Sequence, residues 1–268
     1  MPADESTAER FSLTKWYLDC ADADGRVAIG YWASVCWRGL AVNWHSVAVH
    51  EPGLAPRVHS SVRQVAAPAQ SGREITWQSP ALHCAFVVDA CTSSPPLRLL
   101  DGPDGHVDWQ CVAPAAHTMV VTDHCAPIRG VGYAECMAIT MLPWKLPIDE
   151  LRWGRWAAGD AAHSVVWIDW QGAAPNRWVL VNGTLCDASS VSDDEVAVDG
   201  GVLTLAQPRT LHKRLLGEIV ASVPPLPALL PPSMLSLREH KWCSEGTWRA
   251  GSGTPETGWA IHEVVRFR

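Results

Sequence analysis

The chain has 268 residues and a formal net charge of −7, from 21 Lys and Arg residues against 28 Asp and Glu residues. Because it has no run of lysine or arginine, we expect neither nucleic acid nor an anionic membrane surface as its partner. No apolar stretch approaches the roughly 20 residues that a membrane-spanning helix needs, so no transmembrane segment is expected.

Cysteine and tryptophan contents narrow the class further. Nine cysteines are an odd number, and no C-x-x-C motif is present. Because the acidic N-terminus also lacks the pattern of a signal peptide, we expect a cytoplasmic protein whose cysteines are small buried apolar residues. The 15 tryptophans, against three Phe and three Tyr, fit either bulky core residues or the walls of a cavity for a large apolar ligand.

The first half of the chain has the pattern of short antiparallel strands. Residues 1–10 are predicted to be a loose leader, followed by a hairpin of 15–20 and 26–32 around the Asp22–Gly25 turn. Further strands are predicted at 40–50, 58–65, 74–78, 82–89, 97–100, 106–112 and 118–122. Even spacing with Gly and Pro between the strands is typical of a β-sandwich or β-barrel.

A proline-bounded hinge, Pro143 to Pro147, divides the chain near its middle. Beyond it, strands are predicted at 152–157, 164–170, 177–181, 196–198, 202–206, 215–222, 235–245 and 259–267, with a tight turn at Asn182-Gly183 and a proline-rich loop at 223–235. We therefore predict an all-β protein of two antiparallel β-barrel or sandwich domains, at 11–142 and 151–268, joined by the hinge 143–150.

One internal similarity indicates duplication. The segments 130–135 (GVGYAE) and 258–263 (GWAIHE) align without a gap, with Gly at the first position and Glu at the sixth. Each segment would lie in the last strand of its own half.

The strand at 164–170 carries the first candidate for catalysis. Since alternate side chains of a strand share a face, Asp169 would lie on the same face as Trp167 and His163. In an apolar cavity burial disfavours the charged carboxylate, which makes Asp169 a candidate proton donor with His163 as its partner. The alternative is that this face meets solvent and Asp169 caps a turn.

Glu135 is the second candidate, because it lies in mid-strand among apolar residues. It is either a cavity acid or, as we favour, the partner of Arg152 or Arg155 in an ion pair. Histidines and cysteines are scattered, and no Walker loop, G-x-G-x-x-G or G-x-S-x-G motif is present. We therefore expect no metal and no cofactor.

Several blocks resemble the superfamily of carotenoid 1,2-hydratases (hydroxyneurosporene synthases) and AttH-like proteins. They are 132–135 (GYAE), 142–147 (LPWKLP), 151–156 (LRWGRW), 167–170 (WIDW) and 258–263, with only 16–19 (WYLD) in the first half. The resemblance implies tandem lipocalin-like (calycin) barrels with a ligand cavity at or near the domain junction. It also implies protonation and hydration of an isoprenoid, or folding of a polyene for cyclisation or a Diels–Alder step.

The catalytic pairs of the hydratases match only in part. Trp167-Ile168-Asp169 would stand at their Tyr-x-Asp pair, with Trp in place of Tyr. The His-x-Trp sequence, His240-Lys241-Trp242, comes after it in the chain rather than before. A cyclase or pericyclase therefore fits as well as a hydratase.

These observations predict a cofactor-independent enzyme of the lyase or isomerase type. It would act by general acid catalysis on a hydrophobic isoprenoid or polyene, with Asp169, His163 and Glu135 as catalytic residues. Aromatic residues would line the substrate cavity: Tyr133, Trp144, Trp153, Trp156, Trp167, Trp242 and Trp259. The alternatives are a non-catalytic carrier of lipophilic ligands with the same cavity and a scaffold with a filled barrel.

Overall fold

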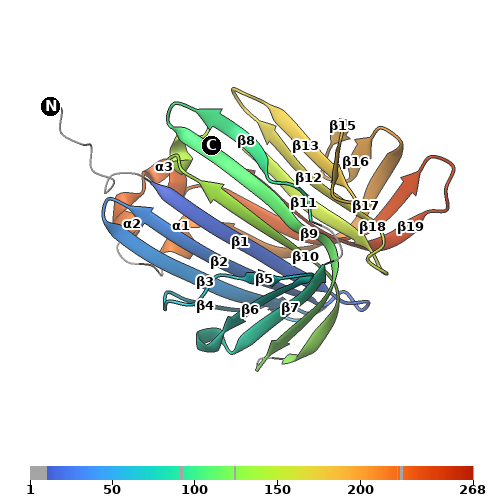
Figure 1. Ribbon diagram of the computed structural model, residues 1–268, viewed down its shortest axis with the longest axis horizontal. Coiled ribbons are helices and arrows are strands. Elements are labelled where there is room, and N and C mark those ends of the chain that lie inside the picture. The colour runs from blue at the N-terminus through green and yellow to red at the C-terminus, as the bar shows by residue number, and fades with distance from the viewer. Residues whose placement is uncertain (1–10, 91–92, 124, 222, 224–225, 268) are drawn as a thin grey trace.

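Two curled antiparallel sheets make up most of the protein, as the computed structural model in Figure 1 shows. The structure describes residues 11–90, 93–123, 125–221, 223 and 226–267. The predicted leader, 1–10, lies outside these residues. The all-β, two-sheet architecture confirms the predicted fold class.

The N-terminal sheet has the strand order β4-β3-β2-β1-β10-β9-β7-β6-β5, with β8 paired to β9. Its strands are β1 (Ser12–Ala21), β2 (Val27–Trp37), β3 (Leu40–His50), β4 (Arg57–Ser61), β5 (Ala69–Ser71), β6 (Glu74–Ser79), β7 (Cys84–Ala90), β8 (Leu97–Gly102), β9 (Gly105–Thr122) and β10 (Cys125–Ile139). A short 3-10 helix, η2 (Pro80–Leu82), precedes β7.

The C-terminal sheet has the corresponding order, β14-β13-β12-β11-β19-β18-β17-β16-β15. The connection to it contains the 3-10 helix η3 (Pro143–Lys145). Its strands are β11 (Glu150–Ala158), β12 (Ser164–Gln171), β13 (Asn176–Val181), β14 (Thr184–Cys186), β15 (Ala188–Val191), β16 (Glu195–Val198), β17 (Gly201–Leu215), β18 (Arg238–Ala250) and β19 (Glu256–Arg266). In both sheets the first strand pairs with the second and with the last.

The predicted turns are confirmed. Asn182 and Gly183, between β13 and β14, both have positive φ, at 52° and 77°, as a tight two-residue hairpin turn requires. At the first hairpin Gly25 has φ 75°. There Asp22 Oδ1 accepts hydrogen bonds from the backbone N–H groups of Asp24 and Arg26, at 3.1 and 2.8 Å, so Asp22 is a turn residue.

Two predicted strands are one. The segments 106–112 and 118–122 both belong to β9, which continues through Pro114. The pairing of β9 with β10 shifts register here, from Gly132 opposite Ala116 to Ala134 opposite Ala113. The irregular ladder accommodates a residue that has no N–H to donate.

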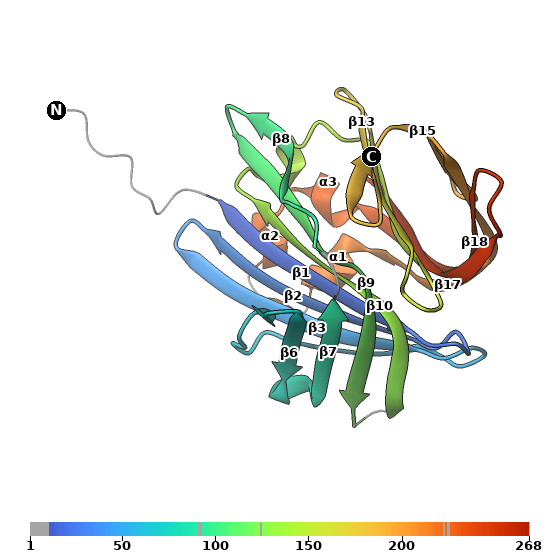
Figure 2. The ribbon, with the colours of Figure 1, turned by 45° about the vertical axis from the view of Figure 1, so that its right-hand side comes forward.

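The prediction of a strand at 215–222 is wrong, because the chain forms helix α1 (Leu216–Val220) after β17. Glu218 Oε2 accepts the backbone N–H of Leu215 at 3.2 Å, which caps the first turn of the helix. The segment predicted as a proline-rich loop contains two further short helices, α2 (Leu226–Leu229) and α3 (Pro232–Leu235). Figure 1 shows the three helices near the ends of β1, β2 and β3, and Figure 2 shows α1 and α3 between this sheet and the C-terminal sheet.

Alternation along β1 divides its side chains between two cores. Leu18 and Cys20 lie in the interior of the N-terminal barrel. Tyr17 and Ala21 point the other way, into a core between the two domains that also contains Tyr133 and Trp153. A third core, around Trp156, fills the C-terminal barrel. The sheets therefore pack face to face through their first and last strands.

An ion pair crosses the interdomain core. Arg155 Nε of β11 lies 3.0 Å from Asp19 Oδ2 of β1, and a second guanidinium nitrogen contacts the other carboxylate oxygen. Both side chains are 0% exposed. The remaining terminal nitrogen of Arg155 donates to the carbonyl of Trp259 at 2.8 Å. The bidentate geometry and the extra hydrogen bond offset the cost of removing two charges from water.

The aligned glycines of the two halves occupy equivalent positions. A Cβ atom on Gly130 would lie 1.9 Å from the carbonyl oxygen of Ala21, and one on Gly258 would lie 1.9 Å from that of Ala157. At both places the last strand crosses the first too closely for any side chain. The registers also correspond, because Glu135 is opposite Tyr17 in the first sheet and Glu263 is opposite Trp153 in the second.

Within the described ranges, none of the helices has the length and apolar character to cross a bilayer.

Removing one member of the ion pair is expected to destabilise the protein strongly. Replacement of Arg155 by Met leaves Asp19 buried without a partner, which should lower the free energy of unfolding by about 3–5 kcal/mol. The double variant Asp19→Leu with Arg155→Met should recover most of this loss, because no buried charge remains. Urea unfolding of the three proteins measures both effects, and a loss below about 1 kcal/mol in Arg155→Met would contradict the assignment.

Candidate functional site

A pocket lies at the junction of the two domains. It has a volume of about 320 Å³ and is bounded by β2, β3 and β4 on one side and by β17 and α1 on the other. We call it the junction pocket. Most of its wall is apolar, formed by Ile29, Tyr31, Trp44, Ala48, Pro56, Val58, Leu211 and Ile219.

The polar residues of the junction pocket include His212 and Arg214 of β17, both held by one carboxylate behind them. His212 Nε2 lies 2.7 Å from Glu239 Oε1, and Arg214 Nε donates to Glu239 Oε2 at 3.0 Å. Although burial raises the pKa of Glu239, the hydrogen bond from His212 and the charge of Arg214 hold it well below its usual range. The pKa of His212 is lowered by burial and by the nearby cations, against the effect of Glu239.

His50, at the end of β3, is the most deeply buried titratable group of the pocket wall. Its residue is 3% exposed, and within the described part of the chain Nε2 has no hydrogen-bond partner. Burial, followed by repulsion from His212, Arg209 and other cations, lowers the pKa of His50 to about 4. His50 is therefore a neutral imidazole at neutral pH.

A buried lysine lies behind the apolar wall. Lys241 is 1% exposed, and its Nζ is 2.5 Å from Glu263 Oε2. The same nitrogen lies 4.8 Å from the ring centroid of Tyr17 and 4.6 Å from that of Trp153, within the range of cation–π attraction. Tyr31 lines the junction pocket and also contacts this lysine, because its ring centroid lies 5.9 Å from Lys241 Nζ.

Glu135 lies in the interdomain core, and the ion pair that we favoured for it is wrong. Its Oε2 accepts hydrogen bonds from Trp109 Nε1 at 2.6 Å, Tyr133 Oη at 2.8 Å and Trp153 Nε1 at 3.0 Å. The arginines have other partners: Arg155 pairs with Asp19, and Arg152 pairs with Glu150 and Asp193. Glu135 is not among the residues that line the junction pocket. A catalytic role for it stays a prediction.

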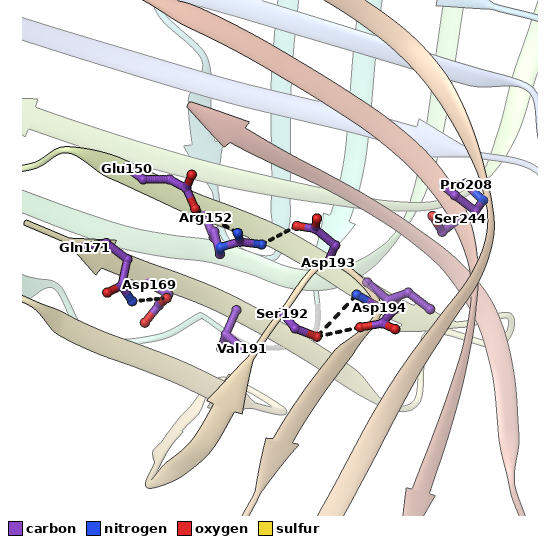
Figure 3. Close-up of a pocket in the computed structure, with 11 residues that line it drawn as sticks. Glu150, Arg152, Asp169, Gln171, Val191, Ser192, Asp193, Asp194, Pro208 and Ser244 are labelled. Carbon is purple, nitrogen blue, oxygen red and sulfur yellow. Dashed lines mark hydrogen bonds and ion pairs between the residues drawn. The ribbon is translucent and has the colours of Figure 1, made fainter. Parts of the chain in front are cut away.

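Asp169 lines a second pocket, of about 650 Å³, inside the C-terminal barrel (Figure 3). The predicted inward face of its strand is therefore present, but the predicted apolar surroundings are wrong. Asp169 Oδ1 accepts from Arg177 Nε at 2.8 Å, and Oδ2 accepts from Gln171 Nε2 at 2.7 Å. Glu150, Arg152, Asp193 and Asp194 also line this pocket. A role for Asp169 as proton donor stays a prediction.

His163 does not partner Asp169, so this predicted pairing is wrong. It lies one residue before β12 begins and directly after the turn and bend at 159–162. Its Nδ1 is 2.7 Å from Glu256 Oε2, and 45% of its side chain is exposed. The period-two alternation on which the pairing depended begins only at the next residue.

The predicted aromatic residues divide among three places and do not form one wall. Trp153 and Trp167 were predicted to line one cavity, but they lie on opposite faces of the C-terminal sheet. None of the seven is among the residues of the junction pocket, where Trp44 is the tryptophan instead. Tyr133, Trp153 and Trp259 are in or against the interdomain core, Trp156, Trp167 and Trp242 lie on the inner face of the C-terminal barrel, and Trp144 of η3 packs on Trp37.

Sequence reasoning missed His50, His212 and Arg214. A signal for the first existed, because alternation along 40–50 places Trp44, Ser46, Ala48 and His50 on one face. The sequence does not show that this face meets a strand some 160 residues later. Among the described residues there is no group of three His, Cys, Asp or Glu side chains that could hold a metal ion.

The fold and the pocket between its halves define a class: tandem lipocalin-like proteins with two antiparallel barrels in one chain. Solved structures with this architecture include CghA in complex with Sch210972, at a TM-score of 0.57 and 10% identity over 97% of this chain and 89% of that one. Kievitone hydratase from Nectria haematococca matches at 0.53 and 8%, over 99% and 93%. An AttH-like protein from Nitrosomonas europaea matches at 0.54 and 8%, over 98% and 94%.

The chain thus has the tandem lipocalin-like fold of these structures, which is the fold that the sequence resemblance implied. At these identities the likeness shows the fold. No protein-family model and no curated protein sequence matches the chain.

Acidification is expected to destabilise the protein through His50. Below about pH 6.5 the unfolded chain binds a proton at this residue that the folded protein, with a pKa of about 4, does not bind. The free energy of unfolding should therefore fall between pH 6.5 and 4, by about 3 kcal/mol from His50. Urea unfolding as a function of pH tests this, and His50→Phe should have the shallower slope.

Proposed function

We propose that the protein is a cofactor-independent enzyme that converts a hydrophobic isoprenoid or polyene, bound in the junction pocket, by cyclisation or hydration. The observation that carries the proposal is the pocket itself, whose apolar wall has histidines beside it at a domain boundary. Its volume of about 320 Å³ is at the lower end of the range for small-molecule sites, and such sites are common at domain interfaces.

His212 is the residue to which we assign proton exchange. A neutral imidazole held in one orientation by a carboxylate can accept a proton and return it, which is the arrangement of His212 and Glu239. This assignment places the acid–base chemistry at the junction rather than at Asp169. The rings of Trp44 and Tyr31 supply π faces that would stabilise positive charge developing on a bound polyene.

Two of the solved structures with this fold support a small-molecule enzyme. One is named as a hydratase, and another contains the small molecule Sch210972. The rival function is a carrier that binds the same ligand in the same pocket without converting it.

Filling the junction pocket should prevent binding. Ala48 lines the pocket and is 7% exposed, so Ala48→Phe places a ring inside it. If the ring displaces two or more CH₂ groups of the ligand, binding should weaken by about tenfold or more. The matched control is Ala41→Phe, on an exposed position of the same strand. Geranylgeraniol and farnesol are suitable probes, followed by tryptophan fluorescence. Equal binding to both variants would contradict the site.

Turnover distinguishes an enzyme from a carrier. His212→Gln keeps a hydrogen-bond donor for Glu239 but cannot exchange a proton, so turnover should fall by about 10²–10⁴ while binding is retained. Mass spectrometry of the incubated isoprenoids detects the gain of one water or a cyclised isomer. Loss of turnover in Asp169→Asn but not in His212→Gln would move the chemistry to the C-terminal barrel. Binding without turnover in the unmodified protein would establish the carrier.

A further inference from the structure

We propose that the ligand of the junction pocket carries a carbonyl or carboxylate oxygen, which His50 and Arg214 bind through N–H groups. The substrate class is thus an isoprenoid or polyene carbonyl compound rather than a pure hydrocarbon. This inference rests on the proposed function of the same pocket.

His50 provides the first observation. It lines the pocket and is almost fully buried, yet Nε2 has no hydrogen-bond partner within the residues that the structure describes. A buried polar atom without a partner is destabilising, and such atoms are rare in folded proteins. A ligand oxygen that accepts a hydrogen bond from the imidazole would supply the missing interaction.

Arg214 provides the second observation. A guanidinium has five N–H donors, and Glu239 accepts from Nε and from one terminal nitrogen, at 3.0 and 3.3 Å. Glu239 is also engaged by His212, and Glu218 Oε2 accepts from the backbone at the start of α1. The carboxylates of this wall are therefore engaged, whereas Arg214 has further N–H groups to donate. A ligand acceptor oxygen fits this surplus of donors.

The apolar body of the ligand would lie toward β4. Val58 lines the pocket and is nevertheless 54% exposed, so the pocket opens to solvent beside an apolar side chain of the edge strand. Leu54, in the loop before β4, is 61% exposed. A ligand with its oxygen at His50 and its hydrocarbon along Val58 would cover this surface.

The arrangement also has a chemical consequence. Two N–H donors on one carbonyl oxygen withdraw electron density from a conjugated chain, which favours attack on that chain by water or by a second double bond. Fixed donors of this kind act without a cofactor.

A pair of isosteric probes tests the inference. Geranylacetone is an isoprenoid ketone, and its hydrocarbon analogue has a methylene group in place of the ketone oxygen. Each probe competes with an apolar fluorescent dye for the protein. We expect the ketone to bind about tenfold more tightly than the hydrocarbon, which is the effect of one satisfied hydrogen bond. In a purely apolar pocket the hydrocarbon would bind more tightly.

Three variants locate the effect. His50→Phe removes both ring nitrogens and should reduce the preference for the ketone to the part that Arg214 supplies, with hydrocarbon affinity changed by less than about twofold. His50→Gln keeps an N–H donor and should retain the preference, which also covers the case that His50→Phe does not fold. The matched control is His45→Phe, on the same strand but facing the N-terminal barrel, which should retain it fully.

The outcomes separate the two proposals. A preference for the hydrocarbon in the unmodified protein, or an undiminished ketone preference in folded His50→Phe, would overturn the inference and leave the proposed function intact. Absence of binding by both probes and by geranylgeraniol would overturn the proposed function as well.

Discussion

The ion pair between Asp19 and Arg155 is the constraint on which the arrangement of the two domains depends. Both groups are fully buried and come from the first strand of each sheet, so the packing of the two barrels must keep the two charges in contact. In this packing β17 and α1 lie against β2, β3 and β4 and enclose the junction pocket with them. The site is thus a product of domain packing rather than of either barrel alone.

Charge is divided unequally between the two pockets. The pocket inside the C-terminal barrel is lined by Asp169, Asp193 and Asp194, whereas the wall of the junction pocket is mainly apolar, with Arg214 and Glu218 as its ionised residues. Asp169 is held by hydrogen bonds from Arg177 and Gln171, whereas burial and repulsion from nearby cations both lower the pKa of His50. The larger pocket is therefore the less suitable one for a hydrophobic ligand.

Local pattern predicted most of the fold and little of the site. The strand 40–50 and the Asn182-Gly183 turn were predictable, because alternation and turn chemistry depend on neighbouring residues. The burial of Asp169 on an inward face also followed from alternation. The hydrogen bond from Arg177 to Asp169 depends on the pairing of β12 with β13. The ion pair of Arg155 with Asp19, and the position of His50 in the same pocket as His212, depend on contacts between distant strands, which no short-range pattern predicts. The two strands predicted at 106–112 and 118–122 are one, because a register shift lets β9 continue through Pro114.

The equivalent positions of Asp19 and Arg155 make the two halves non-interchangeable. Asp19 lies two residues after Tyr17, which is opposite Glu135. In the second sheet Arg155 lies two residues after Trp153, which is opposite Glu263. Two copies of the N-terminal half docked in this way would press two carboxylates together in a dry core, and two copies of the C-terminal half would do the same with two guanidinium groups. Opposite charge at one matched position therefore favours pairing of each half with the other and disfavours self-association of either half through this face.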